Sequence, residues 1–248
     1  MTQVGTDFIR ALEEHRAAVL ADRAPDPHPI PRRLMLSWIH HDNMLEGRLF
    51  QTAEIVAAMD DRDDEFDKYL HPLLSEIRRY RDAILFVQAQ ANEGPDSVSL
   101  GALKTIHKML TPDAKDRGGL YRRNSPVHRD YYQRICTADK VPYSLRKLFE
   151  FIEEECELAC DPVAFAADVH HRLMVIYPFR RNPGTTARLF TNLLLMSRGY
   201  PPVIVPAHQR REYYDALCRP DAEPLTEVFR DAVGVFLERS NEVGLTAL

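Results

Sequence analysis

The sequence has no apolar run that approaches the roughly 18 residues of a membrane span. Its first residues, Met-Thr-Gln-Val-Gly-Thr-Asp, show no signal-peptide pattern. It also lacks an excess of positive charge, because 32 Lys and Arg stand against 37 Asp and Glu, for a formal net charge of −5. Proteins that bind nucleic acid usually present a basic domain or stripe. We therefore expect a cytoplasmic protein whose partners include neither nucleic acid nor a membrane.

Cysteine is scarce as well. The four cysteines form no Cys-x-x-Cys pair. Cys156 and Cys160 lie one helical turn apart, but no second pair has the spacing of a zinc site. His170 shares the apolar face of its expected helix, which favours a hydrogen-bonded core histidine over a metal ligand. We therefore expect reduced thiols and no metal centre.

Glycine is also rare, with 10 residues, and the 17 prolines fall mostly between periodic segments. Apolar residues recur at helical spacing, which predicts an all-α fold with one sizeable core. Asp161 followed by Pro162 is a strong signal for a helix start. The expected helices span roughly residues 4–22, 31–44, 50–60, 64–91, 100–110, 142–159, 162–176, 185–197, 206–218 and 221–240.

A loop between two of these helices carries the sequence Tyr-Pro-Phe-Arg-Arg-Asn-Pro-Gly-Thr-Thr-Ala-Arg at residues 177–188. The first amides of a helix lack intrahelical partners and the helix dipole is positive there, so such a loop can bind an anion. Any loop that leads into a helix offers free amides, however. The residues alone therefore leave a structural turn and a phosphate cradle both open.

This string resembles the signature of the Fic (Fido) family of nucleotidyl transferases, His-Pro-Phe-x-(Asp/Glu)-Gly-Asn-Gly-Arg-x-x-Arg. The positions that keep the family's residue are Pro178, Phe179 and Arg188. The replaced positions are Tyr177 for the catalytic His, Arg181 for the metal-binding carboxylate, Asn182, Pro183 and Gly184 for Gly-Asn-Gly, and Thr185 for the first Arg. The likeness continues in order over residues 100–240.

The resemblance implies a Fic-like helical core with a short β-hairpin flap and an N-terminal helical segment. The expected parts are the N-terminal segment at 1–98, the core at 99–240 and a tail at 241–248. In the family the flap docks a target protein by strand pairing, which would place Tyr131, Tyr132 and Arg134 in a protein interface. These residues and Arg122 also suit a plain solvated loop. An oligomer is compatible with the sequence too.

The segment from Asp42 to Gly47 resembles the family's inhibitory motif, (Ser/Thr)-x-x-x-Glu-(Gly/Asn), with Asp42 in place of Ser or Thr. In the family this Glu reaches the second Arg of the loop and blocks the terminal phosphate of the nucleotide. Glu46 and Arg188 are both present. The resemblance therefore predicts that they form a clamp across the pocket.

The replacements change the chemistry that the resemblance implies. Tyr177, with a reference pKa of about 10, is a poor general base unless its surroundings lower that pKa. Arg181 cannot ligate magnesium, although a guanidinium can contact phosphate directly. Ordinary AMP transfer is therefore not expected, and no cofactor is predicted.

Three functions fit these residues. In the first, the protein is a pseudoenzyme that binds a protein partner, or a small anion or nucleotide. The residues expected at such an anion site are Arg181, Gly184, Thr185, Thr186 and Arg188, whose arginines would replace the metal. In the second, the pocket runs a different reaction with Tyr177 and Glu46 as catalytic residues beside the two arginines. In the third, the chain is a structural or interaction module.

Overall fold

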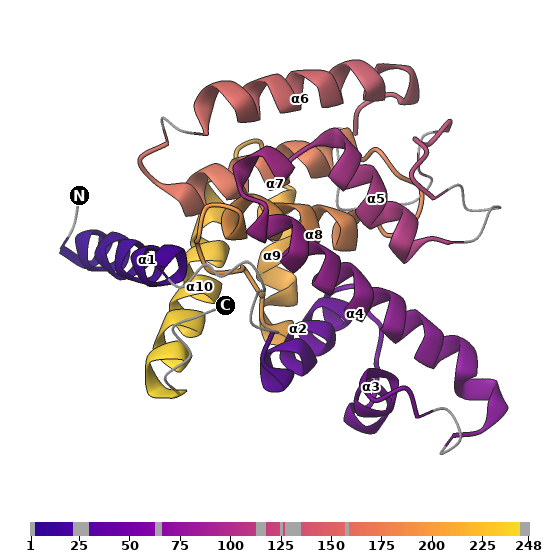
Figure 1. Cartoon of the computed structure of the whole chain (residues 1–248). Helices are drawn as coiled ribbons and strands as arrows, with labels where there is room; N and C mark the ends of the chain where they lie inside the picture. Colours follow the sequence, from indigo (N-terminus) through magenta and orange to yellow (C-terminus); the bar gives the residue numbers. More distant parts are fainter. Residues whose placement is uncertain are drawn as a thin grey trace.

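The computed structural model describes residues 3–21, 30–62, 66–112, 118–124, 126, 135–156 and 159–243 (Figure 1). These residues form helices and turns without a strand, which confirms the expected all-α fold. The α-helices are α1 (Gln3–Ala21), α2 (Arg32–Leu45), α3 (Thr52–Met59), α4 (His71–Asn92), α5 (Leu100–Leu110), α6 (Val141–Glu155), α7 (Pro162–Ile176), α8 (Pro183–Met196), α9 (Arg210–Leu217) and α10 (Glu223–Val243). The short 3-10 helices are η1 (Lys68–Leu70), η2 (Pro95–Ser97), η4 (Ala138–Lys140) and η5 (Ala207–Gln209).

One expectation differs from this outcome, and another falls largely outside the described residues. The flap hairpin is not seen among the described residues, and Tyr131, Tyr132 and Arg134 lie outside them. The helix expected from residue 64 begins only at His71, because η1 precedes it and the Asp67 carboxylate accepts the Tyr69 N–H at 3.0 Å.

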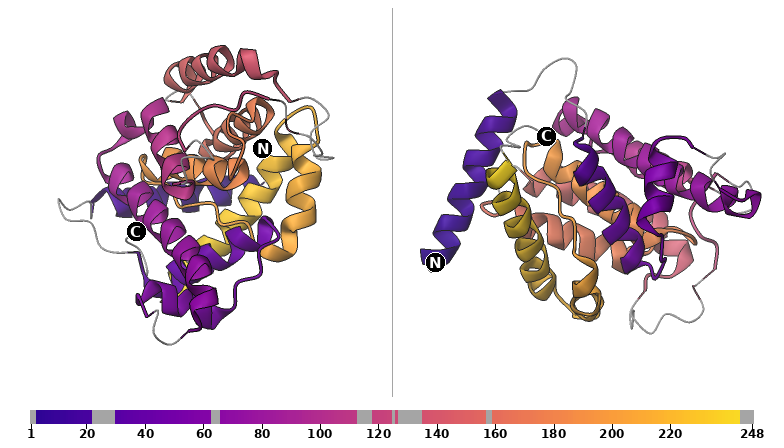
Figure 2. Two further views of the ribbon diagram at one scale, coloured as in Figure 1. Left: turned by 90° about the vertical axis from the view of Figure 1, so that its right-hand side faces the viewer. Right: turned by 90° about the horizontal axis from the view of Figure 1, so that it is seen from below.

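Helix α8 lies at the centre of the fold, and all 14 of its residues are buried. It packs against α4, α5 and α7, which run beside it in two views (Figure 1, Figure 2). Its polar side chains are satisfied inside the core. Thr191 donates to the Ala187 carbonyl, and the Asn192 amide bonds both the N–H and the C=O of Val203. A helix that is covered on every face can hold a loop at its N-terminus in a fixed position.

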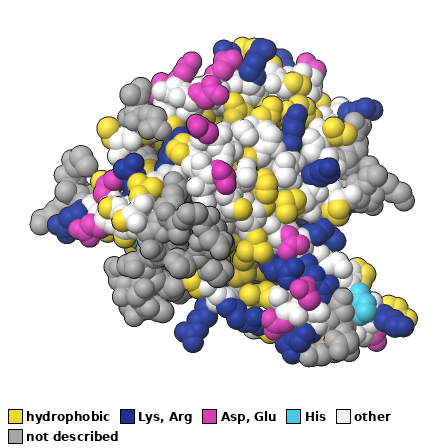
Figure 3. Space-filling view, in the orientation of Figure 1, with side chains coloured by type: hydrophobic (Ala, Val, Ile, Leu, Met, Phe, Trp, Pro, Cys, Tyr) yellow, Lys and Arg dark blue, Asp and Glu magenta, His cyan; other side chains and the backbone are white. Residues whose placement is uncertain are grey.

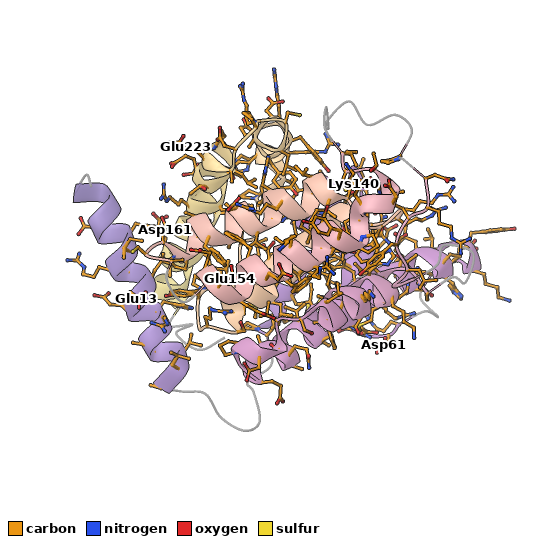
Figure 4. All side chains as sticks on the ribbon, turned by 90° about the horizontal axis from the view of Figure 1, so that it is seen from above. Glu13, Asp61, Lys140, Glu154, Asp161 and Glu223 are labelled. Carbon is orange, nitrogen blue, oxygen red and sulfur yellow. The ribbon has the colours of Figure 1, made fainter. Side chains whose placement is uncertain are left out.

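The C-terminal helix α10 also packs against α7. Helix α10 contacts α7, α9 and α1. Asp161 begins α7 as expected: its carboxylate accepts the N–H groups of Val163 and Ala164, each at 2.9 Å. Asp161 lies beside α10 (Figure 4), and its carboxylate also pairs with Arg230 of that helix at 2.5 Å. The cap of α7 thus also ties α7 to α10.

Acidic and basic side chains are interspersed on the face shown in Figure 3, most densely over the end of the molecule that holds α3 and the start of α4. There Asp61 pairs with Arg78 at 2.9 Å and with Arg81 at 3.2 Å. No helix within the described residues is both long enough and apolar enough to cross a membrane.

Candidate functional site

The loop between α7 and α8 is bounded by two residues with left-handed backbone. Tyr177 ends α7 with φ of 48°, and Asn182 precedes α8 with φ of 49°. Asn adopts this conformation readily, whereas for a bulky residue such as Tyr it is uncommon. Contacts from elsewhere in the fold must therefore hold Tyr177 in place.

Arg122 supplies those contacts. Its buried guanidinium donates to the Tyr177 carbonyl at 2.6 Å, to the Ile176 carbonyl at 3.3 Å and to the Cys136 carbonyl. Carbonyls at the end of a helix lack intrahelical partners, and a cation there also complements the helix dipole. The reading of Arg122 as part of a solvated loop is therefore wrong: this side chain caps α7.

His107 of α5 fixes the middle of the loop. Its ring stacks on Phe179 with centroids 3.9 Å apart. Its Nδ1 accepts the Gly119 N–H at 2.8 Å, so the neutral ring must carry its proton on Nε2, which donates to the Arg181 carbonyl at 3.1 Å. Burial lowers the pKa of His107 to about 4. The imidazole is therefore neutral at physiological pH and acts as a bridge between two loops.

Arg188 lies one turn into α8 and is 4% exposed. Its guanidinium contacts two carboxylates. It donates to Asp42 of α2 through Nε and Nη2, and to Glu46, the residue directly after α2, through Nη2 at 2.8 Å. Burial alone would lower the pKa of Arg188, but its neighbours Asp42, Tyr213 and Glu46, Asp42 most of all, raise it well above its ordinary value. The expected contact between Glu46 and Arg188 is thus present, with Asp42 as an additional partner.

A chain of hydrogen bonds continues from Arg188 into the core. Nη1 of Arg188 donates to the Tyr213 hydroxyl at 3.2 Å, so this hydroxyl donates to Nε2 of His170 at 2.8 Å. Nδ1 of His170 then donates to the Thr191 hydroxyl at 3.1 Å. Burial, followed by the charge of Arg188, lowers the pKa of His170 to about 3. His170 is a hydrogen-bonded core histidine, as expected.

The Glu46 carboxylate also packs against the first turn of α8, at Gly184. A Cβ atom added to Gly184 would collide with Oε1 of Glu46 and lie 3.0 Å from Nη1 of Arg188. Glycine is therefore required at position 184 so that the carboxylate can approach the helix backbone. A negative group at this point is favoured by the positive end of the α8 dipole.

The remaining predicted site residues are distributed unevenly. Thr185 is buried, and its hydroxyl accepts from Arg188 at 3.3 Å. Thr186 is also buried and donates to the Asn182 carbonyl at 2.6 Å, as part of the turn that starts α8. The Tyr177 side chain is only 1% exposed, whereas Arg181 is exposed. The structure thus brings Glu46, Gly184, Thr185 and Arg188 together and leaves Arg181 at the surface.

Sequence reasoning missed Asp42 and Tyr213 as partners of Arg188. Asp42 had a usable signal, because it lies four residues before Glu46 and therefore on the same face of α2. Tyr213 had none, since nothing in its local sequence indicates that α9 lies beside Arg188. No group of three or more His, Cys, Asp or Glu side chains in the described ranges is arranged to hold a metal ion.

A cavity of about 430 Å³ lies at the opposite end of α8 from this loop. Its walls include Arg16 and Leu20 of α1, Phe165 of α7, Leu195 of α8 and Tyr200. None of the predicted site residues lines it. We therefore place the candidate site at the start of α8, where the charged groups converge, and not in this cavity.

Comparison with known proteins agrees with the resemblance seen in the sequence. The sequence model of the Fic/DOC family matches residues 97–195. The protein adenylyltransferase fic-1 of Caenorhabditis elegans is 30% identical over 122 residues, covering 49% of this chain and 24% of that protein. The protein adenylyltransferase Fic of Drosophila yakuba is 29% identical over 186 residues, covering 72% and 36%. The aligned regions thus span only a quarter to a third of these relatives' length.

Solved structures show the same fold. A fragment of Fic-1 from C. elegans superposes with a TM-score of 0.73 at 21% identity and covers 98% of this chain and 73% of its own. A Fic-domain signaling protein from Bacteroides thetaiotaomicron superposes with a TM-score of 0.75 at 15% identity, over 95% of this chain and 97% of its own. At these identities the likeness concerns the fold.

Proposed function

Because the chain carries a Fic/DOC-family domain over residues 97–195, we propose that it is a divergent member that binds a small anion or nucleotide and does not transfer AMP. The observation that carries this proposal is the position of Glu46. Its carboxylate lies against Gly184 at the first turn of α8 and contacts Arg188. The molecule therefore holds an anionic group of its own where an anionic ligand would bind.

Two replacements support the loss of AMP transfer. Tyr177 stands at the position of the general base, and a buried phenol with a reference pKa of about 10 rarely releases its proton at neutral pH. Arg181 stands at the position of the metal-binding carboxylate, and a cation cannot hold magnesium on a phosphate. The loop therefore lacks a proton acceptor and a metal ligand at the two positions where the family supplies them.

A different reaction in the same pocket is less well supported. It would require the Tyr177 side chain to reach a substrate, yet that side chain is 1% exposed. It would also use Glu46 as a catalytic group, and Glu46 is already paired with Arg188. Binding requires only that a ligand displace the Glu46 carboxylate from α8.

The absence of AMP transfer can be tested with labelled ATP, magnesium and candidate proteins that bear accessible hydroxyl groups. The wild-type chain and a Glu46→Ala variant should both give no adduct, and the C. elegans fic-1 enzyme serves as the positive control. The variant matters because it removes the carboxylate that blocks α8. Clear magnesium-dependent labelling of either form would refute this part of the proposal.

Ligand binding is tested by calorimetry with phosphate, sulfate and nucleotides in excess chelator. Binding should survive chelation, strengthen in Glu46→Ala because an internal competitor is lost, and weaken in Arg181→Ala. Arg180→Ala is the matched control, since Arg180 is the exposed neighbour in the same loop. If no anion binds, or if binding strictly requires magnesium, the proposed metal-free site is wrong and the loop is a structural turn.

A further inference from the structure

The hydrogen bonds of Arg188 are almost completely allocated within the protein. Nε and Nη2 face the two oxygens of Asp42, and the Nη2–Oδ2 distance is 2.9 Å. Nη2 also contacts Glu46 and Thr185, while Nη1 donates to the Tyr213 hydroxyl. A guanidinium has five N–H groups in a fixed plane, and its strongest arrangement is a two-point contact with one carboxylate. In this chain Asp42 has that arrangement.

The two carboxylates are therefore unequal partners of Arg188. Asp42 makes two contacts and its side chain is 5% exposed, whereas Glu46 makes one contact and is 13% exposed. One cation between two anions leaves a net charge of −1 in the cluster. If Glu46 leaves, a neutral and fully paired Asp42–Arg188 unit remains. Glu46 is thus the partner that an incoming anion can displace.

The surroundings of Asp42 reinforce this difference. Tyr80 of α4 is buried and lies close to Asp42. Burial, and then the charge of the nearby Asp42, hold the pKa of Tyr80 well above its ordinary value. The phenol therefore stays neutral and places no second cation beside the Asp42 carboxylate. Among the described residues, Arg188 is the only basic side chain that forms an ion pair with Asp42.

We propose that Asp42 withholds Arg188 from ligands, so that this loop binds a single anionic group and gains no affinity from the further phosphates of a nucleoside triphosphate. This inference rests on the anion site proposed above. The start of a helix offers a partial positive charge of about half a unit and a few free amides, which suits one phosphate or carboxylate. Each further phosphate adds negative charge, which a charge-assisted contact with a guanidinium would stabilise. The buried guanidinium of Arg188 could supply that contact, but Asp42 already neutralises its charge.

The state of Arg188 can be measured without any ligand. Solvent exchange of its Nε–H proton, followed by NMR of the arginine side chains, reports whether the guanidinium is still held. We expect slow exchange in the wild type and in Glu46→Ala, and faster exchange in Asp42→Asn, which keeps the side-chain shape. Fast exchange in Glu46→Ala would overturn the proposal, because Asp42 alone would then not hold Arg188.

The consequence for ligands is measured by calorimetry with AMP and ATP in excess chelator. In Glu46→Ala we expect ATP and AMP to bind within about threefold of each other. In Asp42→Ser combined with Glu46→Ala, freed Arg188 should make ATP bind at least about tenfold more tightly than AMP. A tenfold preference for ATP already in Glu46→Ala, or the same ratio in both variants, would overturn the proposal.

Two controls separate this result from misfolding and from failure of the anion site. Asp168→Ser is the matched control for Asp42→Ser, because it removes the same kind of side chain from an exposed ion pair, that of Asp168 with Arg172 on α7. If Asp42→Ser does not fold, as judged by its thermal melt, Asp42→Asn with Glu46→Ala takes its place. If Arg188 exchanges slowly in Glu46→Ala and no variant binds AMP, the proposed anion site is wrong, whereas the hold of Asp42 on Arg188 stands.

Discussion

Replacing Asp42 with Asn should lower the free energy of unfolding far more than replacing Glu46 with Gln. Both changes keep the side-chain shape and remove one negative charge beside Arg188. Asp42 makes the two-point contact, and both partners are about 95% buried. Removal of one member of a buried pair leaves the other charge uncompensated, which costs about 3 kcal/mol or more. Glu46→Gln leaves the Asp42–Arg188 pair intact, so we expect a loss of about 1 kcal/mol.

The measurement is equilibrium unfolding in urea at pH 7, followed by circular dichroism. Asp168→Asn is the control, because the exposed pair of Asp168 with Arg172 should contribute less than about 0.5 kcal/mol. The Asp42 effect should also persist at high salt, since a buried pair is poorly screened. Equal losses for Asp42→Asn and Glu46→Gln would refute the unequal roles that we assign to the two carboxylates.

Two further predictions concern the same region. Gly184→Ala should lower the free energy of unfolding of the wild type by about 1 to 2 kcal/mol, because the added methyl group collides with Glu46. In the Glu46→Ala background the same change should stabilise the fold slightly, because Ala is the better helix former. A loss of stability in both backgrounds, measured by urea unfolding, would refute this. Stability should also fall as the pH drops below about 6.5, since the pKa values of folded His107 and His170 lie near 4 and 3 and the unfolded chain takes up protons first. Urea titrations should show a loss of about 3 kcal/mol between pH 6.5 and 5, roughly halved in His107→Gln.

Much of the helical framework was predictable from the sequence. Apolar residues at helical spacing, prolines between the segments and the Asp161-Pro162 start signal placed most helices close to their observed bounds. The predicted start of α4 was wrong because the apolar periodicity of the sequence continues through residues 64–70. The Asp67 side chain caps the short helix η1 there, and this local hydrogen bond outweighs the apolar pattern.

The candidate site was predictable only where the likeness to the Fic family pointed to specific residues. It identified Glu46 and Arg188 although 142 positions separate them. Asp42 was recognised as a departure from the family pattern, but its two-point contact depends on the distance between α2 and α8. The position of Arg122 under the end of α7 likewise depends on how distant segments pack. Such contacts have no local signature in a single sequence.

The burial of every residue of α8 has a consequence for how the protein can respond to a ligand. Backbone amides in such a helix exchange with solvent only when the whole molecule opens, so α8 should rank among the slowest-exchanging segments. A ligand at its first turn can therefore displace the parts around α8 far more easily than α8 itself. Glu46 directly follows the end of α2, so its release would be transmitted to α2 and to α3, which packs against α2. We expect any change on ligand binding to appear as altered amide exchange in α2 and α3.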